Sequence, residues 1–188
     1  MLRNILVIAP ALAVWSPVVW LYLPLLPLLL RRRSLAPYGY AIRSWRLTWS
    51  RRLLVAPGFL CAFAISMGVW RLLVGTPPLA EGTRLSGDMI VRQLLWIALP
   101  EELFFRGYVL QRLQDATTPR QPPCSRGPLL LSAALFALAH VVTLSGWGRA
   151  AVFFPACLLA WLRVHSQGLL LPTLFHWLAN LLVLGFHG

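Results

Sequence analysis

Charged residues are scarce in this sequence, and lysine is absent. The 188 residues include 17 Arg and five Asp or Glu, so that only 12% of the chain is charged. Soluble domains have roughly a quarter of their residues charged, which argues against an ordinary soluble domain. Apolar residues make up 59% of the chain and the mean hydropathy is +0.71, values that exclude disorder. The composition is that of a membrane protein.

Cysteine is also rare, and its positions exclude two further classes. Cys61, Cys124 and Cys157 are odd in number and lack metal-ligand spacing, so we predict no disulfide framework. The net charge of +12 is compatible with nucleic-acid binding, but the Arg residues lie between long apolar runs and not along one polar face. We therefore attribute them to membrane topology and expect no nucleic-acid partner.

Long apolar runs are abundant. A helix needs about 20 mostly apolar residues to cross the ~30 Å hydrocarbon layer. Six runs qualify, of which the fifth is the shortest: Ile5 to Leu30, Leu53 to Val74, Met89 to Leu110, Pro128 to Leu144, Ala150 to Val164 and Leu169 to Phe186. We predict an all-α, polytopic transmembrane helix bundle of about six spans, formed as a single integral membrane domain over residues 1–188.

The segment between the first two runs carries seven arginines, and such a bias places a loop in the cytoplasm: Arg31, Arg32, Arg33, Arg43, Arg46, Arg51 and Arg52. The same segment contains Tyr38, Tyr40, Trp45 and Trp49. This mixture of aromatic and basic residues suits the headgroup region over anionic lipid. We expect residues 34–50 to anchor the loop at the membrane surface.

Two acidic residues, Glu101 and Glu102, interrupt the third apolar run. A charge at mid-membrane costs at least ~2.5 kcal/mol, so each one requires a partner or a function. Arg106 lies one helical turn after Glu102 and is its natural salt-bridge partner, whether that bridge serves a site or only helix packing. Glu101 has no local counter-charge and is a candidate general base. Pro100 should loosen the helix just before the pair because it has no N–H.

Three further polar residues fall at a similar depth. His140 lies on the fourth run, one turn after Phe136, and His176 and Asn180 share a face of the sixth run. With Glu101 they occupy one slab about 10 to 18 Å above the inner surface. A single membrane histidine usually only bonds one helix to another. Four such residues on three runs at one depth predict a site instead.

These residues could hydrolyse an amide by direct attack of water. Glu101 would take a proton from the water, His140 would help to orient it, and His176 and Asn180 would stabilise the developing oxyanion. No serine or cysteine has a histidine in a triad-like pattern, which disfavours a covalent nucleophile. One Glu and two His also match a catalytic zinc site, although the His-Glu-x-x-His signature is absent.

The order Glu101-Glu102-x-x-x-Arg106, Phe136-x-x-x-His140 and His176-x-x-x-Asn180 resembles the CAAX protease and bacteriocin-processing (CPBP, or Abi) family of intramembrane glutamic endopeptidases. The resemblance implies a catalytic segment over residues 89–186 and a mechanism without a metal or other cofactor. It also implies that Glu101 and His140 activate water, that His176 and Asn180 stabilise the oxyanion, and that Glu102, Arg106 and Phe136 support the site.

The compact size is similar to the prokaryotic branch of that family, and the chain also resembles the small myxosortase-like subgroup linked to C-terminal sorting signals. We therefore expect a multi-pass protein of the prokaryotic inner (cytoplasmic) membrane. Its partners would be the lipid bilayer and a protein or peptide substrate with a hydrophobic tail or leader. Three alternatives remain: a non-catalytic scaffold or bacteriocin-immunity factor, a zinc-dependent membrane metalloprotease, and a proton-coupled transporter.

Overall fold

The computed structural model describes residues 19–45, 54–74, 86–117, 126–144 and 147–187. All regular secondary structure within these ranges is helical, so the predicted all-α class is confirmed. The helices are α2 (Leu25–Leu30), η1 (Ile42–Trp45), α3 (Val55–Val74), α4 (Gly87–Arg92), η3 (Gln93–Ala98), α5 (Leu99–Glu102), η4 (Leu103–Val109), α6 (Leu110–Thr117), α7 (Arg126–Leu144), η5 (Trp147–Val152), α8 (Phe153–Ser166) and α9 (Leu170–His187).

A single continuous helix runs from α4 to α6 and carries both glutamates. It begins at Ser86, whose hydroxyl accepts a hydrogen bond from the Met89 N–H and caps the first turn. Two π-helical stretches, η3 and η4, lie on either side of α5. The first ends at Ala98, two residues before Pro100, where the missing N–H is predicted to loosen the helix. Such π-helical turns often occur at functional sites.

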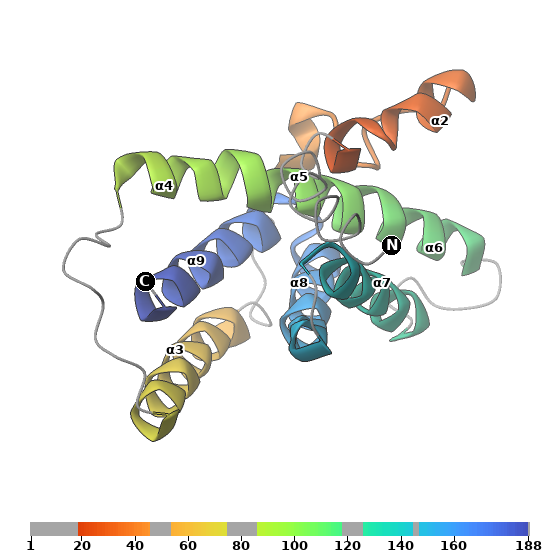
Figure 1. Cartoon of the computed structure of the whole chain (residues 1–188). Helices are drawn as coiled ribbons and strands as arrows, with labels where there is room; N and C mark the ends of the chain where they lie inside the picture. Colours follow the sequence, from red (N-terminus) through yellow and green to blue (C-terminus); the bar gives the residue numbers. More distant parts are fainter. Residues whose placement is uncertain (1–18, 46–53, 75–85, 118–125, 145–146, 188) are drawn as a thin grey trace, which may run out of the picture.

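Helices α7, α8 and α9 pack beside this long helix, and α3 lies along α9 (Figure 1). One apolar core joins α3, α8 and α9 through Ala56, Leu159, Leu162 and Phe175. A second core joins η4, α7 and α8; its members are Phe105, Ala133, Phe136 and Ala156. The polar site described below lies where the long helix meets α7 and α9.

Two side chains bond the long helix to its neighbours through the backbone. Trp177 of α9 donates its indole N–H to the Ile90 carbonyl at 2.9 Å, and the Ser132 hydroxyl of α7 donates to the Phe105 carbonyl at 3.2 Å. Polar contacts of this kind hold helices together in lipid, where burial of apolar surface gives no driving force between them.

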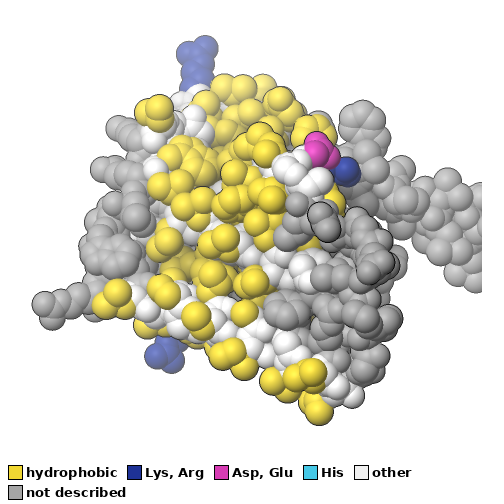
Figure 2. Space-filling view, turned by 90° about the vertical axis from the view of Figure 1, so that its left-hand side faces the viewer, with side chains coloured by type: hydrophobic (Ala, Val, Ile, Leu, Met, Phe, Trp, Pro, Cys, Tyr) yellow, Lys and Arg dark blue, Asp and Glu magenta, His cyan; other side chains and the backbone are white. Residues whose placement is uncertain are grey.

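The surface of the bundle is strongly apolar. Figure 2 shows a broad face of hydrophobic side chains with charged groups only towards its edges. By length and composition, one helix among the described residues could cross a membrane by itself, over Arg126–Thr143 of α7. Shorter apolar helices cover Val19–Leu30, Val55–Ser66 and Leu170–Gly185. The six predicted spans therefore stay a prediction, and residues 5–18 of the first lie outside the described residues.

The described part of the aromatic segment packs against the rest of the protein, and its predicted anchoring at the headgroups stays a prediction. Tyr38 is buried, and Trp45 donates its indole N–H to the Gly39 carbonyl at 3.0 Å. The Tyr40 hydroxyl donates to the Leu21 carbonyl at 2.9 Å, and burial raises its pKa to about 12. The reason is a close approach between this segment and η4. A Cβ on Gly107 would collide with the Tyr38 carbonyl, so only glycine fits there.

Candidate active site

The candidate residues come from three elements that meet at one point. Glu101 and Glu102 lie on α5, His140 lies on α7, and His176 lies on α9. The two adjacent glutamates point to different neighbours, as their 100° separation on a helix requires. They consequently belong to two clusters, which differ in the partner that each carboxylate faces: an arginine for Glu102 and two imidazoles for Glu101.

The arginine cluster consists of Glu102, Arg106, Phe136 and Ala156. Glu102 is completely buried, and its Oε1 lies 3.0 Å from the Nη1 of Arg106, which is the predicted ion pair. Arg106 also donates from Nη2 to the Ala156 carbonyl at 3.3 Å. Its guanidinium carbon lies 4.3 Å from the ring centroid of Phe136, a cation–π contact. The cluster thus connects the long helix to α7 and α8.

The histidine cluster consists of Glu101, His140 and His176. The Oε2 atom of Glu101 lies 3.7 Å from the Nε2 of His176 and 4.0 Å from the Nε2 of His140. This oxygen is buried and has no hydrogen-bond partner among the described residues. Two polar atoms separated by 3.7 to 4.0 Å can both bond one water at about 2.8 Å. The arrangement is therefore suited to positioning a water molecule against a carboxylate.

The other nitrogen of each imidazole is already occupied. The Nδ1 of His140 lies 3.0 Å from the Phe136 carbonyl, and the Nδ1 of His176 lies 2.9 Å from Glu102 Oε1. A carbonyl only accepts, and a carboxylate paired with arginine does the same, so both Nδ1 atoms carry the proton. When either ring is neutral, its Nε2 is an acceptor facing Glu101. His176 also links the two clusters, because it contacts both glutamates.

Asn180 lies one turn beyond His176 on α9 and is not in hydrogen-bond contact with the histidine cluster. Its Nδ2 instead donates to the Oε1 of Gln93 at 3.4 Å. Gln93 begins the π-helical stretch η3 and was not among the residues singled out in the sequence. The sequence feature that could have identified Gln93 is that it is an uncharged polar residue within the third apolar run, about two helical turns before Glu101. One Asn180 amide hydrogen is thereby assigned, and the other remains available to a ligand.

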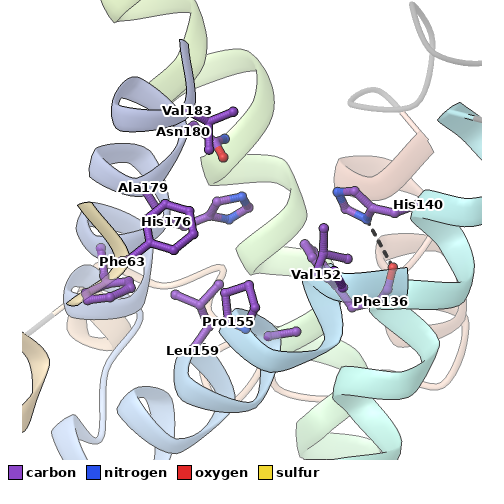
Figure 3. Close-up of a pocket in the computed structure, with 13 residues that line it drawn as sticks. Phe63, Phe136, His140, Val152, Pro155, Leu159, His176, Ala179, Asn180 and Val183 are labelled. Atoms are coloured by element: carbon purple, nitrogen blue, oxygen red, sulfur yellow. Dashed lines mark hydrogen bonds between the residues drawn. The ribbon is translucent and has the colours of Figure 1, made fainter. Parts of the chain in front are cut away.

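An apolar cavity of about 210 Å³ adjoins the histidines (Figure 3). The imidazoles of His140 and His176 point towards each other across it, from α7 and α9 (Figure 3). The cavity is lined by Phe63, Phe136, His140, Ala151, Val152, Pro155, Ala156, Leu159, Phe175, His176, Ala179, Asn180 and Val183. The polar groups thus lie beside a space that a substrate could enter.

The zinc alternative depends on the same three side chains. Among the described residues, no group of three or more His, Cys, Asp or Glu has the geometry to hold a metal ion. Glu101, His140 and His176 nevertheless supply one oxygen and two nitrogens within about 4 Å, which is the donor type that zinc prefers. Metal dependence is therefore a question for the assay proposed below.

Residues 86–182, slightly more than half of the chain, match the family model described as type II CAAX prenyl endopeptidase Rce1-like. The chain belongs to the Rce1-like family. No curated protein and no solved structure matches it. The members of this family are proteases and integral membrane proteins. The match confirms the predicted resemblance at the family level. The match extends over α4 to α9 and thus includes both clusters; the myxosortase-like subgroup stays a prediction.

Proposed function

We propose that this protein is an intramembrane endopeptidase that hydrolyses a peptide bond in a membrane-associated protein or peptide. Glu101 acts as the general base towards a water molecule, and His140 orients that water through its Nε2 acceptor. The observation that carries the proposal is the buried Oε2 of Glu101, which lacks a hydrogen-bond partner among the described residues and faces two imidazole nitrogens. This is the environment that a catalytic carboxylate requires.

The oxyanion of the tetrahedral intermediate is stabilised from α9. His176 can donate from Nε2 only when both ring nitrogens carry protons, because Nδ1 already donates to Glu102. Asn180 supplies the second donor with the amide hydrogen that Gln93 does not take. Glu101 then returns the proton to the leaving amine.

The substrate follows from the surroundings of the site. The cavity beside the histidines is lined mostly by apolar side chains, and the described part of the face in Figure 2 is mostly apolar as well. A protein or peptide with a hydrophobic tail or leader can reach such a site from within the lipid. The chain would act as a multi-pass protein of the prokaryotic inner membrane.

Cleavage of peptides with apolar tails, presented in phospholipid liposomes and read by mass spectrometry, tests the proposal. The wild type and Glu101→Gln are compared, each with and without a zinc chelator. We expect Glu101→Gln to lower kcat by about 10²- to 10⁴-fold, the usual contribution of a general base, and the chelator to have no effect.

Three results would contradict the proposal. Loss of wild-type cleavage in the chelator would show that the same side chains hold a metal. Full activity of Glu101→Gln would show that the histidine cluster only packs helices together. Absence of any cleavage by a folded wild type would favour the scaffold or immunity function.

A further inference from the structure

The lining of the cavity divides into a polar side and an apolar side. The polar side consists of His140, His176 and Asn180, which belong to the proposed catalytic machinery. All other lining side chains are apolar, and none carries a carboxylate, guanidinium or amide. A charged group placed in this cavity would lose its hydration without gaining a partner on the apolar side, so it should be rejected.

The size of the cavity restricts what it can hold. Its volume of about 210 Å³ lies below the ~300 to 1,000 Å³ of pockets that enclose a whole drug-sized ligand. It is therefore large enough for one bulky side chain of a longer substrate, and too small for the rest of that substrate.

A second apolar cavity, of about 270 Å³, adjoins the first. The two cavities share Phe63 of α3, Pro155 of α8, and Phe175 and Ala179 of α9. These four side chains form the wall between them. Phe63 and Ala179 are only half-buried, whereas Phe175 is buried in the core, so the first two can be changed with less disturbance of the packing.

We infer that the smaller cavity receives a bulky apolar side chain next to the scissile peptide bond, and that Ala179 and Phe63 set the size of side chain accepted. The inference rests on the proposed function, because it needs the scissile carbonyl at His176 and Asn180. Ala179 directly precedes Asn180 on α9 and lines the same cavity. If His176 and Asn180 bind the scissile carbonyl of the substrate, the substrate side chain next to that carbonyl faces the apolar side of the cavity.

Two substitutions should change the preference in opposite directions. Ala179→Leu adds volume to the wall and shrinks the cavity, whereas Phe63→Ala removes the wall and joins the two cavities. The probe is a set of apolar-tailed peptides in which the residues flanking the cleavage site are Ala, Leu, Phe, Trp or Asp. One methylene in an apolar pocket changes kcat/KM by about 10- to 200-fold, which sets the scale of the expected changes.

We expect the wild type to prefer Leu or Phe over Ala and to reject Asp. Ala179→Leu should move the preference to Ala by at least about tenfold in the kcat/KM ratio, and Phe63→Ala should move it to Trp by a similar factor. Ala134→Leu is the matched control, because Ala134 lies exposed on α7 and does not line this cavity. Thermal unfolding in detergent identifies any variant that fails to fold.

The inference is overturned if folded Ala179→Leu and Phe63→Ala keep the wild-type preference, or if the wild type accepts Asp as readily as Leu. Failure of the proposed function appears separately. If Glu101→Gln cleaves the peptides normally, the catalytic assignment is wrong whatever the side-chain preference. If Glu101→Gln is inactive and the preferences do not change, only the inference about the cavity is wrong.

Discussion

The two clusters around α5 begin at adjacent residues and have opposite properties. In the arginine cluster, Glu102 is completely buried and its Oε1 is bonded by both Arg106 and His176. In the histidine cluster, Glu101 faces two imidazole nitrogens at distances too long for direct hydrogen bonds. One carboxylate is thus paired with a buried arginine, while its neighbour faces only the two imidazoles. Each of the two glutamates keeps a buried Oε2 atom without a hydrogen-bond partner among the described residues.

Under the proposed function, this difference explains how the long helix can maintain a reactive carboxylate at Glu101. A buried charge is tolerated only when it is paired, and Glu102 satisfies that requirement. The same ion pair fixes His176 through its Nδ1 and seats Arg106 on Phe136, whose carbonyl holds His140. Both imidazoles that face Glu101 are consequently oriented by the arginine cluster. The comparison predicts that substitutions in one cluster reduce stability and substitutions in the other reduce the rate.

Arg106→Met gives the largest expected effect on stability. Removing one partner of a buried ion pair leaves Glu102 uncompensated and costs about 3 to 5 kcal/mol of the free energy of unfolding. Denaturant unfolding in detergent measures the loss. Arg92→Met is the control on the same long helix, because Arg92 is exposed and should change stability by less than about 0.5 kcal/mol. Equal losses in the two variants would remove the distinction between the clusters.

Asn180→Ala should give the next largest effect, on rate alone. Loss of one oxyanion donor lowers kcat by about 10²- to 10³-fold, or ~2.7 to 4 kcal/mol. KM should change little, because the donor acts mainly in the transition state. Steady-state kinetics with the apolar-tailed peptides provide the measurement, and Leu178→Ala on the exposed side of α9 is the control. A rise in KM at constant kcat would assign Asn180 to substrate binding.

Gly107→Ala probes the contact between η4 and the aromatic segment. The added methyl group collides with the Tyr38 carbonyl, and such overpacking costs about 1 to 3 kcal/mol. Gly58→Ala in α3 is the matched control, since a Cβ there contacts nothing, and it should stabilise the helix by about 0.5 to 1 kcal/mol. If Gly58→Ala lowered the free energy of unfolding and Gly107→Ala left it unchanged, the aromatic segment around Tyr38 would not pack on η4.

Gln93→Leu is expected to have the smallest effect. In the proposed mechanism Gln93 positions the Asn180 amide, and the loss of one hydrogen bond worth about 1 kcal/mol corresponds to roughly a fivefold loss in kcat. KM and the unfolding temperature should not change. Gln93→Glu keeps the acceptor oxygen and should recover most of the rate. If Gln93→Glu is as slow as Gln93→Leu, the hydrogen bond to Asn180 is not what matters.

The sequence predicts the helical class, because the length of the apolar runs indicates helices that cross a membrane. It also predicts that Glu101, His140 and His176 meet, because polar residues on different helices can meet only at a similar depth in the membrane. It does not predict the contact of Asn180 with Gln93, since one polar residue in an apolar run is compatible with many partners. The inward packing of Tyr38 was also missed. It depends on the absence of a side chain at Gly107, far along the chain, whereas aromatic and basic composition alone indicates a membrane surface.

The division of roles between the two glutamates is tested most directly by measuring cleavage and unfolding side by side for Glu101→Gln and Glu102→Gln. We predict that Glu101→Gln loses at least about 10²-fold in kcat and keeps the wild-type unfolding free energy. Glu102→Gln should lose about 3 to 5 kcal/mol of stability, because Arg106 is left without its counter-charge. Equal losses of stability in the two variants, or an active Glu101→Gln, would contradict the account.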